Sequence, residues 1–189
     1  AEKKALHCSM EKLARELWPK YMGNAAIPAD RLVLIRAVID ELSKRHTTRE
    51  AFVDTIRQHI PNLEAFVRNH DLPDQDASRP LIVRETPAYM RGGGAGASVS
   101  APGPFDPCAN TYYNVSPLDK FTPDQAESYL REHNDWMVQI LNIHEAVPGH
   151  YTQLIHANKS RSPIKAIFGN GSRTEGWAVF SEKMMLDGG

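Results

Sequence analysis

The chain has 189 residues, of which 41% are hydrophobic and 24% are charged, and its formal net charge is -1. This balance is ordinary for a soluble globular protein, and without an excess of basic residues no nucleic-acid partner is expected. No apolar run approaches the roughly 18 residues of a membrane span. The charged, helix-like start is not a signal sequence, which leaves a cytoplasmic and an exported or periplasmic location both open.

Residues 1–70 are predicted to form an N-terminal helical segment. Asp30 is a predicted N-cap for the second helix, and Pro19 is expected to end or bend the first. A third helix is predicted from about Thr48 to the residue before Pro61, followed by a short fourth. The apolar stripes of the first two helices are expected at Leu6, Met10, Leu13 and Leu17, and at Leu32, Ile35, Ile39 and Leu42.

Residues 71–118 are predicted to be a connector made of loops and short strands. LIVRE (81–85) and NTYYNV (110–115) have the β-branched and aromatic character of strands. Between them, RGGGAGASVSAPGPFDP (91–107) is a Gly-rich loop that lacks the GxxxxGK[ST] pattern of a phosphate loop. A plain surface loop and a substrate-facing loop are both compatible with this composition.

The two cysteines, Cys8 and Cys108, lack the CxxC spacing of zinc or redox motifs. Two unrelated thiols are favoured over a disulfide, and the compartment is therefore not decided by cysteine usage.

Residues 119–189 are predicted to hold the metal-site helices. Thr122 is a predicted N-cap, with Pro123 at the first helical position and Gln125 completing a capping box. The helical pattern is expected to break near residues 133–135, so two helices are predicted before the motif HEAVPGH (144–150).

The motif HEAVPGH differs from the common zinc motif HExxH by two additional residues. Six residues of regular helix rotate the second histidine by about 240°, which is away from the face of His144. Pro148 and Gly149 lie between the two histidines, where proline removes a helical hydrogen bond and glycine tolerates unusual dihedral angles. A local distortion of the helix is therefore predicted to bring His150 back towards His144.

A third ligand is expected from a carboxylate on a second helix, and Glu175 stands 25 residues after His150. Two imidazoles and one carboxylate leave an open position for water, which is the pattern of catalytic zinc. The cation would lower the pKa of that water to about 7, and Glu145 would take its proton. Glu182, seven residues after Glu175, shares its helix face and is a candidate partner of a ligand.

Each of these features is weak when taken alone. A single HE pair on a helix is usually solvated, an EGW triplet is uninformative, and His156 is better explained as an ordinary histidine. Their combination and order along the chain favour a Zn²⁺ site.

At HEAVPGHYTQ (144–153) and RTEGWAVFSEKMM (173–185) the chain resembles the bacterial domain-of-unknown-function 885 family, which is placed among the gluzincin zinc peptidases. The family pattern resembles HExxPGHHxQ followed by EGWAxYxE. The resemblance implies that His144, His150 and Glu175 are zinc ligands and that Glu145 is the general base. It also covers GPFDPCANTYYNV (103–115), where a strand edge is implied to hold an extended substrate; Tyr113 in this segment is a candidate for contact with a metal ligand or with the substrate.

The chain departs from the family pattern at two positions of the motifs. Tyr151 replaces a second histidine, so that position offers no imidazole and its side chain is expected to face the substrate; Phe180 replaces a frequent tyrosine. Members of the family run to several hundred residues, so a missing C-terminal segment of the same protein is expected to supply substrate-holding groups.

The sequence therefore predicts a mainly α (α+β) fold, a zincin-like helical domain with a small β element that is part of a larger protein. The leading functional hypothesis is a zinc-dependent peptidase acting on a peptide substrate. Two alternatives stay open: a catalytically incompetent metal-binding or scaffold domain, and a metal amidase acting on a non-peptide amide. Subsites, and hence endo- or exopeptidase action, are not specified by these motifs.

Overall fold

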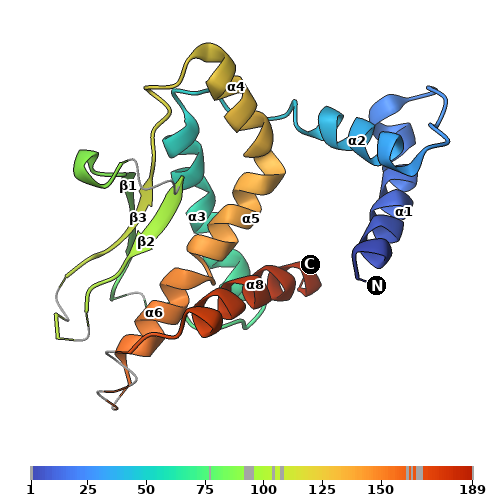
Figure 1. The fold of residues 1–189 in the computed structure, drawn as a ribbon. Coiled ribbons are helices and arrows are strands. Elements are labelled where there is room, and N and C mark those ends of the chain that lie inside the picture. The colour runs from blue at the N-terminus through green and yellow to red at the C-terminus, as the bar shows by residue number, and fades with distance from the viewer. Residues whose placement is uncertain are drawn as a thin grey trace.

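The computed structural model describes residues 2–76, 78–91, 96–103, 105–106, 109–160, 162, 164 and 168–188. It is mainly helical with one small sheet, as the sequence predicts (Figure 1). The helices are α1 (Glu2–Met22), α2 (Arg31–Leu42), α3 (Phe52–Asn69), α4 (Pro123–Glu132), α5 (Asp135–Glu145), α6 (His150–Asn158) and α8 (Gly171–Asp187). The strands are β1 (Leu81–Glu85), β2 (Ala97–Ser100) and β3 (Thr111–Val115), and a 3₁₀ turn spans Ala88–Met90.

Helices α1 and α2 form a hairpin that lies apart from the rest of the fold (Figure 1). Its own small core contains Ala14, Trp18, Leu34, Ile35 and Val38. Asp30 caps α2 as predicted, because its side chain accepts from the amides of Leu32 and Val33. The predicted stripes are only partly correct, since Leu6, Leu13, Leu32 and Ile39 are exposed.

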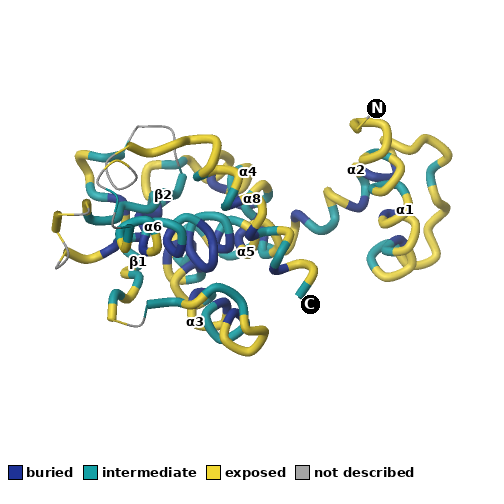
Figure 2. Tube along the Cα trace, turned by 90° about the horizontal axis from the view of Figure 1, so that it is seen from below, coloured by how far each residue is buried: buried dark blue, intermediate teal, exposed yellow. Residues whose placement is uncertain are grey.

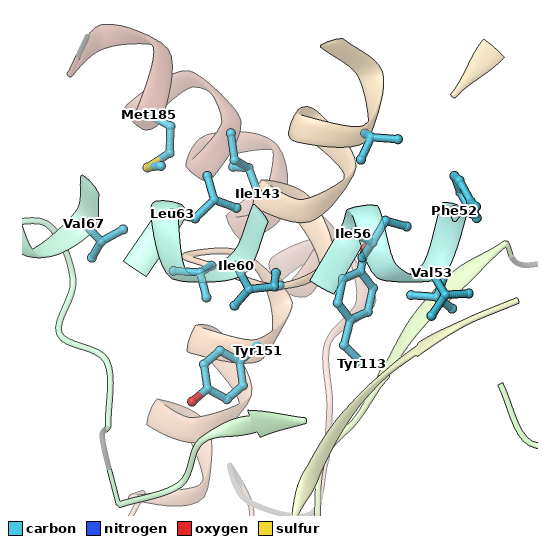
Figure 3. Packing of buried hydrophobic residues seen from close by; sticks show 14 of the residues in the cluster. Phe52, Val53, Ile56, Ile60, Leu63, Val67, Tyr113, Ile143, Tyr151 and Met185 are labelled. Atoms are coloured by element: carbon cyan, nitrogen blue, oxygen red, sulfur yellow. The ribbon is translucent and has the colours of Figure 1, made fainter. Parts of the chain in front are cut away.

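Helix α3 is one continuous element, so the prediction that a helix stops before Pro61 is wrong. Proline removes one backbone hydrogen bond and normally kinks a helix. Here the buried face runs on past it, through Ile56 and Ile60 to Leu63 and Val67. Packing of this long apolar face outweighs the local cost of the proline, and Figure 3 shows these residues along one side of α3.

The sheet has the order β1-β3-β2, with β1 parallel and β2 antiparallel to β3. Both strands predicted from sequence, β1 and β3, are present, whereas β2 lies in the segment that was predicted to be a loop. Tyr113 and Val115 of the central strand β3 are fully buried against the helices. The sheet therefore forms one wall of the main core, and the buried residues lie between it and α3, α5 and α6 (Figure 2).

The capping prediction for α4 is confirmed, since Thr122 and Gln125 form a capping box with Pro123 at the start of the helix. Asn134 caps α5 by accepting from the amides of Trp136 and Met137, which explains the break at residues 133–135. Cys108 and residues 92–95 of the Gly-rich loop lie outside the described residues, and Cys8 is exposed. Within the part of the chain that the structure describes, no helix has both the length and the apolar character that crossing a membrane requires.

Candidate metal centre

The helix that carries His144 ends before it reaches His150. Helix α5 stops at Glu145 and α6 begins at His150, so the two histidines belong to different helices. The amides of Ala146 and Val147 both donate to the carbonyl of Asn142, at 2.9 and 3.1 Å. The departure from a regular helical ladder is thus confirmed, although it is a complete break rather than a bulge within one helix.

Gly149 allows the chain to turn back at this break. A Cβ atom at this position would lie 1.8 Å from the carbonyl oxygen of His144 and 2.3 Å from that of Ile143. Only a residue without a side chain permits that approach. Its φ is −73°, so the close backbone contact, and not a positive φ, is the reason for glycine here.

The break brings the two imidazoles together. The rings of His144 and His150 have their centroids 4.8 Å apart at an interplanar angle of 88°. Ligand-type atoms of His144, Glu145 and His150 all lie within 4.8 Å of one another. Two histidines that are six positions apart in the sequence thereby lie at one shared site.

Glu175 approaches both imidazoles from α8. Its Oε2 atom lies 3.5 Å from Nε2 of His144 and 3.6 Å from Nε2 of His150. Two atoms bound to one tetrahedral zinc at about 2.0 to 2.2 Å are roughly 3.3 to 3.6 Å apart. The distances from the carboxylate oxygen to the two nitrogens therefore fit a zinc ion held by these three side chains.

Both Glu145 and Glu175 are close enough to be considered as the carboxylate ligand. Burial raises the pKa of Glu145 to about 7, while the neighbouring His144 opposes and Glu175 adds to that increase. A carboxyl group that titrates near neutral pH suits proton transfer. Glu175, whose side chain is 65% exposed and whose oxygen faces both Nε2 atoms, is the better ligand candidate.

The side chain of His144 is oriented by a second carboxylate. Its Nδ1 atom lies 2.6 Å from Oε1 of Glu182, one of the contacts that join α5 and α8. Such a contact places the ring proton on Nδ1 and leaves Nε2 free as a metal ligand. Glu182 thus lies where the helix-face argument placed it.

His150 has no comparable partner on its other ring nitrogen. Its Nδ1 atom and the Oε1 atom of Gln153 are both buried without a hydrogen-bond partner among the described residues. Burial lowers the pKa of His150, with Glu175 opposing and His144 reinforcing that shift. A neutral imidazole is the form that binds metal.

The hydroxyls of the two tyrosines considered as contacts of a ligand or of the substrate form hydrogen bonds inside the protein. The hydroxyl of Tyr151 donates to the carbonyl of Arg79 at 2.6 Å, and that of Tyr113 donates to Oδ1 of Asn142 at 3.0 Å. Both side chains are almost fully buried in the main core (Figure 3). In addition, β3 is paired on both sides, so it has no free edge for an extended substrate. Both side chains are therefore part of the core, and their burial does not favour a substrate-facing position for either.

Trp177 and Ser181 were not predicted as site residues, although both contact the break between α5 and α6. The indole Nε1 of Trp177 and the hydroxyl of Ser181 both donate to the carbonyl of Pro148, at 2.9 and 3.3 Å. On α8, Trp177 follows Glu175 by two residues and Ser181 directly precedes Glu182, and this proximity was the available signal.

The chain matches known proteins over all or nearly all of its length. The model of a family described as "Bacterial protein of unknown function (DUF885)" matches residues 1–189. A solved structure of a candidate lipoprotein of unknown function from Shewanella oneidensis is 49% identical, with a TM-score of 0.88 over 100% of this chain and 33% of that one.

A second solved structure, of a candidate lipoprotein from Colwellia psychrerythraea, is 19% identical with a TM-score of 0.66, over 97% of this chain and 30% of that one, and shows the fold alone. The chain therefore spans about a third of the length of each of these relatives. No curated protein matches it.

Proposed function

Because the chain belongs to the DUF885 family of bacterial proteins, whose description names no activity, we propose a function from the site itself: a zinc-dependent peptidase of gluzincin type. The observation that carries the proposal is the position of Glu175, whose carboxylate oxygen lies 3.5 and 3.6 Å from Nε2 of the two histidines. Two imidazoles and a carboxylate are a ligand set of catalytic zinc.

His144, His150 and Glu175 would hold the ion in this proposal. When bound, zinc supplies Lewis-acid polarisation of a carbonyl and increases the acidity of water. Glu182 keeps His144 in the tautomer whose Nε2 is free, through its 2.6 Å contact with Nδ1. These residues come from α5, α6 and α8, so the break at Pro148 and Gly149 is required to assemble them.

Glu145 is the general base and general acid in this proposal. Burial raises the pKa of its carboxyl group, and a carboxylate beside the ion is a group that can take and return a proton. In peptide hydrolysis it takes a proton from the attacking water and delivers it to the leaving amine. Its position next to His144 keeps the carboxyl beside the ligands without making it one of them.

The experiment for the proposal is hydrolysis of a mixed peptide library by the purified protein, with and without a chelator, together with metal analysis. We expect peptide cleavage that stops when the metal is removed and returns with zinc. Bound zinc without peptide cleavage would favour the metal-binding or scaffold alternative, and cleavage of non-peptide amides alone would favour the amidase. If the purified protein neither carries zinc nor binds added zinc, the proposal is contradicted directly.

The same proposal extends to the longer protein. Because this chain spans a third of its solved relatives, the groups that hold the peptide substrate are proposed to come also from further segments of such a protein. The lipoprotein description of the Shewanella oneidensis relative favours an exported location over a cytoplasmic one. Fractionation of cells that express the natural gene tests this: an exclusively cytoplasmic protein would contradict it.

A further inference from the structure

The carbonyl oxygen of Pro148 lies at the centre of the break and accepts hydrogen bonds from α8. Pro148 is buried, and in the sequence it lies between the two histidines. Nε1 of Trp177 donates to its carbonyl at 2.9 Å, and Oγ of Ser181 lies 3.3 Å from the same oxygen. One acceptor in the break is therefore contacted by two residues of the helix that carries Glu175.

These two donors are not equivalent. The hydroxyl of Ser181 has a single hydrogen, and its Oγ also lies 2.9 Å from the carbonyl of Trp177, one turn earlier in α8. That shorter contact competes for the hydrogen. Among the residues that the structure describes, the indole N–H of Trp177 has no second acceptor, so it is the principal donor to Pro148.

The position of α8 relative to the break decides where Glu175 lies. A shift of α8 by one residue along its axis would move Glu175 by about 1.5 Å and rotate it by about 100°. Either change removes the spacing of 3.5 and 3.6 Å from the two imidazoles. Because the Glu175 side chain is largely exposed, it has little packing of its own to hold it in place.

We propose that Trp177 is a positioning residue, whose bond to Pro148 fixes the register of α8 so that Glu175 meets His144 and His150. Trp177 follows Glu175 by two residues, so the hydrogen bond acts within one helical turn of the ligand. Glu182 holds the same helix to His144 two turns further on. This inference depends on the zinc site proposed above, but it concerns zinc affinity and not peptide hydrolysis.

The test is zinc titration of metal-free protein by calorimetry, with Trp177→Phe against wild type. Phenylalanine keeps an aromatic ring and removes the donor. Trp18→Phe is the matched control, because Nε1 of Trp18 donates to the carbonyl of Ala25 at 2.8 Å within the separate α1–α2 hairpin. We expect zinc affinity to fall about tenfold for Trp177→Phe, because residues that orient metal ligands typically contribute at least that factor. Zinc affinity of Trp18→Phe should stay within about twofold of wild type.

A double-mutant cycle with Glu175→Ala identifies the route of the effect. If Trp177 acts by placing Glu175, Trp177→Phe should change zinc affinity by less than twofold once Glu175 is absent. An equal loss with and without Glu175, or no loss in either background, overturns the proposal.

A measurement on wild type avoids dependence on the folding of a variant. Coupling between two sites is reciprocal, so bound zinc should strengthen the bond from Trp177 to Pro148. Hydrogen exchange of the Trp177 indole N–H is expected to slow about tenfold on zinc addition, with that of Trp18 unchanged. Equal responses of both indoles, or none, contradict the inference. A wild-type protein that binds no zinc contradicts both this inference and the proposed function, whereas one that binds zinc without hydrolysing peptides contradicts only the latter.

Discussion

Nδ1 of His144 lies 2.6 Å from Oε1 of Glu182, so a carboxylate on α8 orients an imidazole on α5. Replacing Glu182 with alanine should lower zinc affinity about 10- to 100-fold, because the ring loses the acceptor that fixes its tautomer and direction. Calorimetric titration of metal-free protein measures the change. Glu127→Ala is the control, since Oε1 of Glu127 lies 3.4 Å from Nε2 of His46, which belongs to the connection between α2 and α3 and is not a metal ligand. Similar losses in both variants would contradict a specific role for Glu182.

Glu145→Gln should abolish most peptide hydrolysis while zinc stays bound. A glutamine side chain cannot take and return a proton, and such groups typically contribute a factor of about 10² to 10⁴ in rate. The measurement pairs kcat with the zinc content of the same sample. Glu175→Gln gives the contrasting result, in which zinc affinity itself decreases. Near-normal turnover by Glu145→Gln would assign proton transfer to another group.

Gly149→Ala should destabilise the protein by about 3 kcal/mol or more, because the added methyl group collides with backbone carbonyl oxygens that cannot rotate away. Denaturant unfolding of the metal-free protein gives the difference in free energy. Gly176→Ala is the matched control: it lies inside α8 with nothing within 4 Å of a Cβ atom. Alanine there should stabilise the helix by about 0.5 to 1 kcal/mol. A tolerated Gly149→Ala would show that the break does not depend on the close approach.

The carboxylate of Asp76 connects the segment before β1 to α6 and gives the protein an acid-sensitive contact. Hydrogen bonds from the Ser78 side chain and the Lys159 ammonium lower the pKa of Asp76 to about 2. The folded state therefore binds fewer protons than the unfolded state between pH 2 and about 3.8, so this contribution to stability is complete above the unfolded pKa and is lost as the pH falls towards 2.

Asp76→Asn removes this titration. In denaturant unfolding the variant should be less stable than wild type at neutral pH, and the difference should narrow as the pH falls from about 4 towards 2. A difference that is the same at every pH would show that the carboxylate charge is not the cause.

Local signals in the sequence predicted much of the fold. Asp30, Thr122 and Gln125 mark helix starts by hydrogen bonds within three residues, so their effect can be inferred without tertiary structure. Pro61 was misleading because its effect depends on packing of the whole α3 face. Strand β2 was missed because its pairing with β3 is a long-range contact between Ala97–Ser100 and residues 112–115.

The residues of the candidate site could be predicted from the sequence, but the contacts that bring them together could not. The residue types at 144, 150, 175 and 182 specify a ligand set, and the two-residue insert indicates that the regular helix must change. The sequence does not contain the position of α8 relative to the break, since that depends on contacts such as Trp177 to Pro148. The burial of Tyr113 and Tyr151 likewise depends on tertiary packing, which places their hydroxyls in hydrogen bonds inside the core.

The separate core of the α1–α2 hairpin implies that the protein opens in stages. Five buried residues hold the hairpin together, and side-chain contacts from Arg45 to Asp135 and from Arg131 to Asp40 connect it to the helices that follow. A unit with so few buried contacts unfolds locally at lower free energy than the main core. Native-state amide exchange should therefore be faster in α1 and α2 than in α3 and α5. The hairpin can then fray and reclose while His144, His150 and Glu175 remain assembled.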